Sequence, residues 1–485
     1  MVPEAGRWQV RWWRDAPVAR RRTVQFAATS AVAGFVIATG AVAAAGPWDG
    51  GQRKAERVRA VTAGRVGGEG HSAAGRVPAA APPVLGALRA GRPSAREGLA
   101  AALEPLLQDP ALGPDRAASV VDVASGEPLF GAGQDVAYTP ASTIKLATSA
   151  AALAALGPEH RIETTVVDGG AGRIVLVGGG DPTLTARPAQ GPGPRFASLT
   201  ELADATARAL KARGTTRTAL AYDASRYTGP VQHVIGTNEN LAPVSALMVD
   251  EGRLDDSSRG PADRTAEPAA GAARKFAAML RERGVEVEGE PTEGGAAPDA
   301  ARLAAVASAP LADLVERALT NSDNDIAEAL ARQTALASGQ PASFEGAAKA
   351  VTDRLSAMGL PMGAVRIADG SGLDRADQAS AEFLARLLAR AADPAAPRLR
   401  PVLTGLPVAG FTGTLRERYG RDTAGRATVR AKTGTLTGVN TLAGTALTPS
   451  GRLLSFAFLA SNTPSADGAQ QALDRLASAV ASTLD

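Results

Sequence analysis

Lysine is scarce in this chain, and one lysine stands close to a serine that it can activate. Only six of the 52 basic residues are lysines, and the others are arginines. Lys145 follows Ser142 by three residues in TPASTIKLATSAAALAALGP, residues 139–158. Arginine keeps its proton in a protein, whereas a lysine removed from water can lose its proton and act as a base. Lys145 is therefore a candidate base for a Ser142 nucleophile.

The apolar run after Lys145 predicts a helix with both side chains at its N-terminal end. Pro140 precedes this run and Gly157-Pro158 follows it, and both are common boundary signals. Residues three apart lie on one face of a helix. The first backbone N–H groups of a helix have no intrahelical partner, so they can bind a developing oxyanion. The pattern predicts nucleophilic catalysis by serine; the alternative is a helix cap beside an exposed lysine.

A second group of polar residues, Ser322-Asp323-Asn324, occurs in LTNSDNDIAEAL. Apolar residues on either side predict two helices, with the three polar residues in the turn between them. Such a turn can direct a hydroxyl and an amide into a cleft. The alternative is that Asn324 only caps the second helix.

A third group, Lys432 to Thr435 in VRAKTGTLTG, falls on a predicted strand. Within it we expect Gly434 to have no packing role and to let a ligand approach the backbone closely. The alternative is an ordinary edge strand with an exposed lysine. Two of the six lysines thus lie in candidate motifs, and the order of the three motifs is consistent with one active site.

The chain has no cysteine and three histidines, which limits the other chemistries. Without cysteine there is no disulfide, no thiol nucleophile and no thiolate metal site. His71 falls in a Gly/Ala-rich stretch and His160 in a loop after the first helix, so we expect both at the surface. His233 stands alone, with no constellation of carboxylates around it. We therefore expect neither a Ser-His-Asp triad nor a metal site nor a cofactor.

The basic excess of the chain lies before residue 94, and the remainder is mildly acidic, which argues against binding of nucleic acid. Residues 1–23 predict a basic cytoplasmic tail that ends in arginines. Residues 24–45 carry no charge and are long enough to cross a bilayer, with everything after them exported. We expect a retained transmembrane anchor and a domain outside the cytoplasm. The alternative is a cleaved signal peptide and secretion, because the segment ends in small-x-small cleavage sites.

Residues 46–93 are rich in Gly, Ala, Pro and Arg and predict a disordered linker. From residue 94 the pattern is globular. Strands are predicted near both ends of this part, at 117–123, 128–131, 429–435, 441–447 and 453–460, with a last helix at 465–484. Strands at both ends with helices between them predict one antiparallel sheet with helices on its faces.

The middle of the globular part departs from this pattern. Further strands are predicted at 162–167, 174–177 and 219–222. We interpret residues 162–300 as an insertion with mostly β structure. It would divide a catalytic domain into residues 94–161 and 301–485.

The three motifs, Ser-x-x-Lys, Ser-Asp-Asn and Lys-Thr-Gly in this order, resemble the set of serine penicillin-binding proteins and β-lactamases. The chain is most similar to the class C low-molecular-mass penicillin-binding proteins, which are D-alanyl-D-alanine carboxypeptidases and endopeptidases. The resemblance covers residues 94–485 and includes four further segments: GGGDPTL (178–184), APVSAL (242–247), DGSGL (369–373) and LPVAGFTGTL (406–415). For Asp181 and Asp369, within two of these segments, turn formation beside Gly and Pro is the expected role.

The resemblance implies the α+β fold of penicillin-binding proteins and β-lactamases, which is a five-stranded antiparallel sheet with helices on both faces. It also implies that Ser142 attacks the bond between two D-alanines of a peptidoglycan stem peptide, with Lys145 as base. Burial and the nearby cation Lys432 would lower the pKa of Lys145. Ser322 would protonate the leaving amine, and Asn324 would hold Lys145 and a substrate amide.

The resemblance assigns the remaining motif residues to substrate binding. Thr433 and Thr435, beside Lys432 and Gly434, would receive the substrate carboxylate, and the N–H groups of Ser142 and Thr435 would form the oxyanion hole. β-Lactam antibiotics would acylate Ser142. A β-lactamase and a catalytically silent cell-wall binding protein are the alternatives. The balance of carboxypeptidase and endopeptidase activity, the preferred diamino acid of the stem and the oligomeric state stay open.

Overall fold

The computed structural model describes residues 94–187 and 196–483. The predicted tail, membrane anchor and linker, residues 1–93, therefore lie outside the described residues, as does His71. Among the helices of the described part, none is both long and apolar enough to span a membrane.

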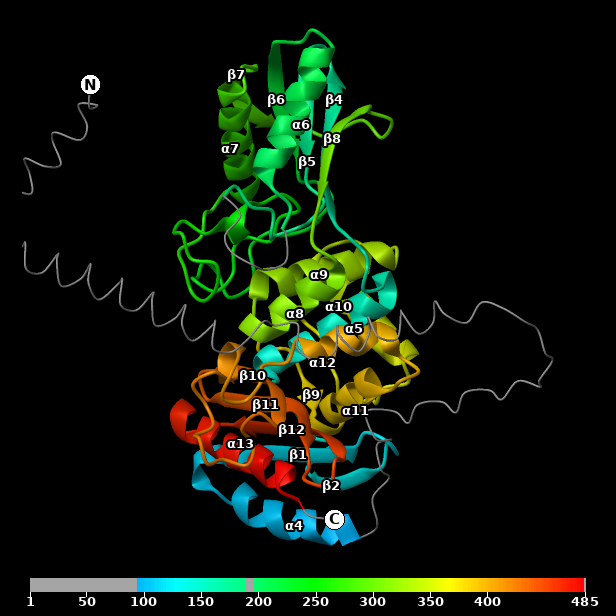
Figure 1. Ribbon diagram of the computed structural model, residues 1–485, viewed down its shortest axis with the longest axis vertical. Coiled ribbons are helices and arrows are strands. Elements are labelled where there is room, and N and C mark those ends of the chain that lie inside the picture. Colours follow the sequence, from blue (N-terminus) through cyan, green and yellow to red (C-terminus); the bar gives the residue numbers. More distant parts are fainter. Residues whose placement is uncertain (1–93, 188–195, 484–485) are drawn as a thin grey trace, which may run out of the picture. The chain divides into compact units, whose positions relative to one another are not determined.

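A five-stranded antiparallel sheet combines strands from both ends of the described chain, as predicted (Figure 1). Its order is β10-β11-β12-β1-β2, and β1 pairs with β12 from Asp115↔Ser461 to Asp122↔Leu454. β10 lies at one edge, so one side of the Lys-Thr-Gly strand is left open to other elements. The strands are β1 (Asp115–Asp122), β2 (Pro128–Ala132), β10 (Val429–Leu436), β11 (Val439–Leu447) and β12 (Leu453–Ser461).

The two faces of this sheet enter two different cores, because successive side chains of a strand point to opposite faces. On β12, Phe456 and Phe458 pack in the core formed with α4 and α13, whereas Ala457 and Leu459 join the core of the central helices. Full burial of one such Phe or Leu contributes about 1.5–3 kcal/mol. The helices are α4 (Ser94–Leu107), α8 (Leu311–Asn321), α9 (Asn324–Ala337), α10 (Phe344–Ala357), α11 (Ala381–Ala392), α12 (Arg400–Thr404) and α13 (Ala466–Ala481).

Helix α5 (Lys145–Leu156) is surrounded by other helices, and every residue from Lys145 to Leu153 is buried. Its sequence, KLATSAAALAAL, has small or apolar side chains on all sides, which is typical of a helix enclosed by protein. The helix ends at Gly157, whose φ of 84° is easily adopted only by glycine. The predicted helix and its C-terminal boundary are confirmed.

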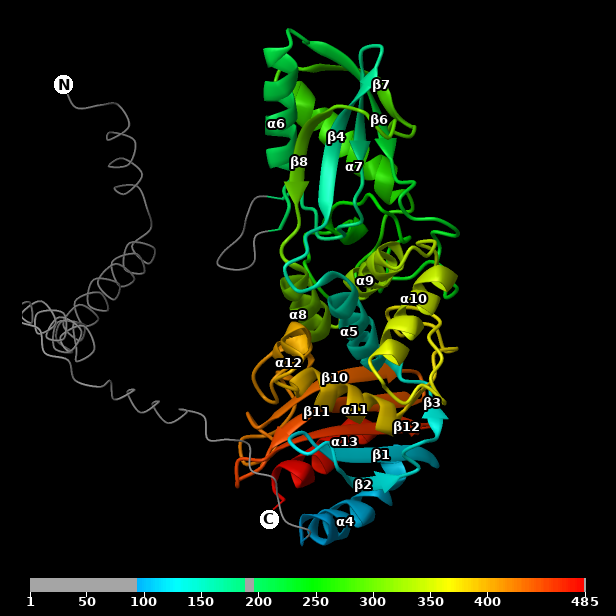
Figure 2. The same cartoon turned by 90° about the vertical axis from the view of Figure 1, so that its right-hand side faces the viewer.

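The insertion forms a second five-stranded sheet, of order β7-β6-β5-β4-β8, with α6 and α7 beside it (Figure 2). Its core includes side chains of both helices. The pairs β5–β6 and β6–β7 are parallel, and the others are antiparallel. The elements are β4 (Glu163–Gly170), β5 (Arg173–Val177), α6 (Leu199–Ala212), β6 (Arg217–Asp223), α7 (Pro268–Glu282), β7 (Glu286–Glu293) and β8 (Arg302–Ala307).

The structure corrects two expectations about the insertion. It is a mixed α/β unit rather than mostly β, because α6 and α7 supply much of its core. It also continues past residue 300, because β8 pairs with β4 from Glu163↔Ala307 to Val167↔Arg302. The sequence of β8, RLAAVA, is short and alanine-rich, so its strand conformation depends on a partner more than a hundred residues away.

Candidate active site

Ser142 and Lys145 lie at the junction of a short 3₁₀ turn and α5. The turn, η2 (Ala141–Ile144), contains Ser142, and Lys145 is the first residue of α5. Ala141 has a φ of 48°, a conformation that costs a non-glycine residue about 1–2 kcal/mol. Lys145 Nζ lies 2.9 Å from Ser142 Oγ, so the structure places the predicted base against the predicted nucleophile.

Lys145 Nζ has two further acceptors, Asn324 Oδ1 at 2.6 Å and the carbonyl oxygen of Ser371 at 2.5 Å. A charged ammonium group would donate one N–H to each of the three acceptors. A neutral amine has only two N–H groups, and it can donate one to the amide oxygen of Asn324 and one to the carbonyl oxygen of Ser371. Its lone pair then points at Ser142 Oγ, which is the orientation that a general base needs.

Burial lowers the pKa of Lys145 to about 8, and four nearby carboxylates, led by Asp369, oppose this decrease. The lysine is fully buried. The charge repulsion between Lys145 and Lys432 shows most clearly at Lys432. Burial, followed by the charge of Lys145, lowers the pKa of Lys432 well below its usual value.

The second motif occupies the turn between α8 and α9, as predicted. Ser322 adopts a left-handed conformation with a φ of 58° and ends α8. Asp323, and not Asn324, caps α9, because its side chain accepts a hydrogen bond from Ile326 N–H at 3.1 Å. The amide of Asn324 is thereby free to contact Lys145.

The third motif brings Lys432 to the second motif. Lys432 Nζ donates to Ser322 Oγ at 2.9 Å and to the Thr433 carbonyl oxygen at 2.7 Å. Thr433 Oγ1 donates to Thr414 Oγ1 at 2.9 Å. Thr414 belongs to LPVAGFTGTL, a segment to which the sequence alone assigned no role.

Gly434 has a packing role, contrary to our expectation. A Cβ atom there would lie 2.2 Å from Thr441 Oγ1 and 2.7 Å from the Pro140 carbonyl oxygen. Thr441 Oγ1 in turn donates to that carbonyl at 2.8 Å. The glycine therefore lets β10 pack directly against the turn that carries Ser142.

These motifs meet in a cleft of about 420 Å³. The two lysines are buried behind its wall. Ser142 and Thr435, whose N–H groups are the predicted oxyanion hole, both line it. The other predicted residues that line it are Ser322, Asn324 and Thr433.

The two aspartates of the recognised segments form turns, as expected. Asp181 Oδ1 accepts hydrogen bonds from Thr183 N–H and Oγ1, at 2.9 and 2.6 Å. Asp369 accepts from four backbone N–H groups of residues 371–374. That second turn presents the Ser371 carbonyl to Lys145, which no sequence pattern could reveal because every residue has a carbonyl group.

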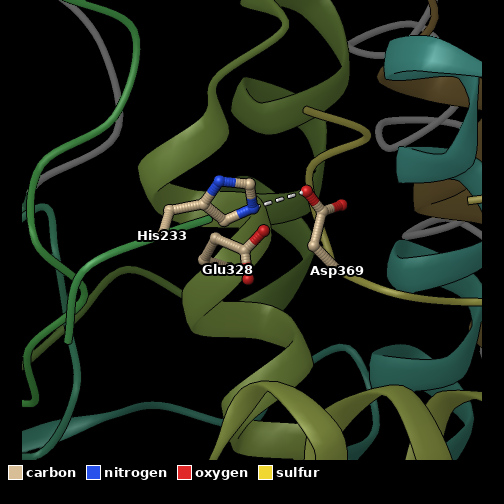
Figure 3. A group of neighbouring side chains, drawn as sticks. All are labelled: His233, Glu328 and Asp369. Carbon is tan, nitrogen blue, oxygen red and sulfur yellow. Dashed lines mark hydrogen bonds and ion pairs between the residues drawn. The ribbon is translucent and has the colours of Figure 1, made fainter. Parts of the chain in front are cut away.

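His233 does not stand alone, contrary to our expectation. Its Nε2 lies 2.9 Å from Asp369 Oδ2, and both side chains are buried (Figure 3). Glu328 of α9 lies beside them (Figure 3). The three residues are far apart in the sequence, so only the fold brings them together.

Among the described residues, two buried groups have side chains of the types found in metal sites: His233, Glu328 and Asp369, and Glu251, Asp323 and Asp325. In the first group, both oxygens of Asp369 already accept hydrogen bonds. In the second group, three arginines form ion pairs with the carboxylates. A cation would have to displace these partners, so we assign no metal to either group.

Comparisons with known proteins point to one family. A carboxypeptidase of Mycobacterium tuberculosis is 37% identical over 428 residues, which cover 84% of this chain and 90% of that protein. A carboxypeptidase of Mycolicibacterium smegmatis is 37% identical over 379 residues, 76% of this chain and 80% of the relative. Penicillin-binding protein 4 of Haemophilus influenzae shares the fold, with a TM-score of 0.64 and 22% identity over 78% of this chain and 98% of that structure.

The family model for D-Ala-D-Ala carboxypeptidase 3 (S13) matches residues 99–263 and 257–480, which include all three motifs and both sheets. The resemblance inferred from the motifs is confirmed. The chain therefore belongs to the D-Ala-D-Ala carboxypeptidase 3 (S13) family.

Proposed function

We propose that this chain is a serine-type D-Ala-D-Ala carboxypeptidase that acts on peptidoglycan stem peptides and is covalently inhibited by β-lactams. The observation that carries the proposal is the position of Lys145 Nζ, 2.9 Å from Ser142 Oγ and 2.6 Å from Asn324 Oδ1. A buried lysine with a pKa of about 8 can accept the proton of a serine near neutral pH. Membership in the family supports the substrate class.

In the first step, Ser142 Oγ attacks the carbonyl carbon between the two D-alanines while neutral Lys145 takes its proton. The oxyanion is held by the N–H groups of Ser142 and Thr435, at the surface of the cleft. Ser322, which receives a hydrogen bond from Lys432, passes a proton to the leaving amine. D-Alanine departs, and water then hydrolyses the acyl-enzyme.

The other motif residues bind the substrate. Thr433 and Thr435 line the cleft and, with Lys432 behind them, receive the terminal carboxylate. The Nδ2 group of Asn324 donates one N–H to the Asn240 carbonyl at 2.9 Å, which leaves the second N–H for a substrate carbonyl. Gly434 contributes through its packing against Thr441 and Pro140.

A DD-endopeptidase activity is a second candidate. The cleft continues from Ser142 to Arg259, Gly260 and Pro261 of the insertion, so a leaving group larger than D-alanine has room. An amine that belongs to a second stem peptide would occupy this part. Release of monomers from a purified cross-linked stem-peptide dimer tests the activity, and an uncleaved dimer beside a cleaved D-Ala-D-Ala peptide would refute it.

The site supports neither a β-lactamase nor a catalytically silent cell-wall binding protein. We find no E-x-x-L-N segment of the class A type, which would supply a deacylating base to a β-lactamase. A silent binding protein would not need a lysine buried against a serine.

We further propose that the domain acts outside the cytoplasm, anchored through residues 24–45. Mass analysis of the mature N-terminus tests this, and a start near residue 44 or 46 would mean a cleaved signal.

Covalent trapping tests the central proposal. Incubation with benzylpenicillin should add one drug mass to the peptide that contains Ser142, and the adduct should persist. The Ser142→Ala variant is the control and should stay unlabelled. Release of D-alanine from a D-Ala-D-Ala peptide separates a carboxypeptidase from a silent protein, and rapid turnover of the drug would indicate a β-lactamase instead.

A further inference from the structure

The inserted unit contacts Asn324, which holds Lys145, and Asp369, which holds the turn that contains Ser371. Apart from Ser142, the acceptors of Lys145 Nζ are Asn324 Oδ1 and the Ser371 carbonyl. One segment of the insertion, residues 233–242 between β6 and α7, makes both contacts. We call this segment the brace.

At one end of the brace, His233 holds the turn that begins at Asp369 (Figure 3). His233 Nδ1 accepts a hydrogen bond from Ile235 N–H at 3.2 Å, so the ring proton is on Nε2 and is donated to Asp369 Oδ2. The ring also packs edge-on against Phe344, with 5.3 Å between ring centroids. The imidazole is therefore fixed in position and in tautomer.

The Asp369 turn transmits this contact to the base. Asp369 Oδ1 accepts from the N–H groups of Ser371 and Gly372, and Glu328 Oε1 accepts from the N–H groups of Gly370 and Ser371. These bonds hold the peptide units on either side of Ser371, so its carbonyl is directed at Lys145 Nζ. His233 is therefore linked to Lys145 through Asp369 and Ser371.

At the other end of the brace, the Asn240 carbonyl accepts a hydrogen bond from Asn324 Nδ2 at 2.9 Å. This bond sets the orientation of the amide, with Oδ1 toward Lys145. Asn238 in turn fixes the backbone there, because its Oδ1 accepts from Asn240 N–H at 2.7 Å and from Leu241 N–H at 3.0 Å. The Ala242 N–H donates to Asp325 Oδ1, next to Asn324 in the chain, at 3.0 Å.

We propose that the brace positions the general base, with His233 acting through Asp369 and Ser371, and Asn238 acting through Asn240 and Asn324. The insertion then sets the rate of acylation even for a substrate too small to touch it. His233 and Asn238 are positioning residues, because neither lines the cleft that contains Ser142. The inference depends on the proposed function, since it needs Lys145 to be the base.

The test is stopped-flow acylation of the full chain by a fluorescent penicillin, which separates the binding constant of the drug from the first-order acylation rate. His233→Leu should lower the acylation rate by about 10- to 100-fold, because displacing a reacting group by about 1 Å can cost 10²-fold. Binding of the drug should be unchanged. His233→Gln keeps an N–H donor near the same place and should stay within about threefold of wild type.

His160 provides the matched control, because it is a half-exposed histidine in the loop after α5. His160→Leu should acylate like wild type. Active-site titration corrects every variant for its folded fraction, so a loss of stability alone leaves the acylation rate of the folded molecules unchanged. Asn238→Ala, a change at a half-buried position, should also lower the acylation rate, and it decides the matter if His233→Leu fails to fold.

Two outcomes overturn the inference: a His233→Leu or Asn238→Ala protein that acylates within about threefold of wild type, or a His233→Gln protein that falls as far as His233→Leu. A wild-type chain that is not acylated at Ser142 would refute the proposed function itself. The two failures are therefore distinguishable.

Discussion

Replacing Lys145 with arginine separates a base from a mere positive charge. Lys145 is fully buried, and its Nζ lies within 2.9 Å of all three acceptors, so no water separates the amine from Ser142. Arginine keeps a charge and has a similar helix propensity, but it cannot accept the proton of Ser142.

Two effects set the expected magnitude. Loss of a general base lowers a rate by about 10² to 10⁴. The guanidinium group is also larger than the ammonium group, and overpacking a filled site costs about 1–3 kcal/mol of stability. The acylation rate of Lys145→Arg should therefore fall by at least about 10²-fold, with a melting temperature lowered by several degrees.

The assay is the second-order acylation rate of a fluorescent penicillin, with thermal melting as the measure of folding. Lys349→Arg is the matched control, because Lys349 is an exposed lysine on α10 that pairs with Asp353 at 2.6 Å. This variant should acylate like wild type. A folded Lys145→Arg protein that acylates within about threefold of wild type would refute Lys145 as the base.

Two further predictions follow from the same geometry. The acylation rate should rise with pH, because Lys145 acts in its neutral form. With a pKa of about 8, the neutral fraction of Lys145 increases from about 10% at pH 7 to about 90% at pH 9. An acylation rate that is already level at pH 6 would contradict this. Gly434→Ala should lower both the acylation rate and the melting temperature, because the new Cβ would clash with Thr441 and with the Pro140 carbonyl; Gly271→Ala, at a helical position with open space, should do neither.

The sequence by itself predicted which residues could carry the chemistry. Ser142 and Lys145 are identifiable because lysine is rare in this chain and because residues three apart in helical structure lie on one face. The individual strands of the antiparallel sheet, helix α5 and the turn before Asn324 also follow from local signals: short apolar runs, glycine, proline and caps. Each of these signals spans a few neighbouring residues, so the sequence displays it directly.

The tertiary structure decided the individual contacts between distant residues. The pairing of β8 with β4, the contact of Gly434 with Pro140 and the bond between His233 and Asp369 join segments from different parts of the chain. Lys145 donates to the backbone carbonyl of Ser371, and Asn324 donates to that of Asn240. Every residue has a backbone carbonyl, so no sequence motif can mark these two. Long-range packing also buries Lys145, and burial is the main cause of its lowered pKa.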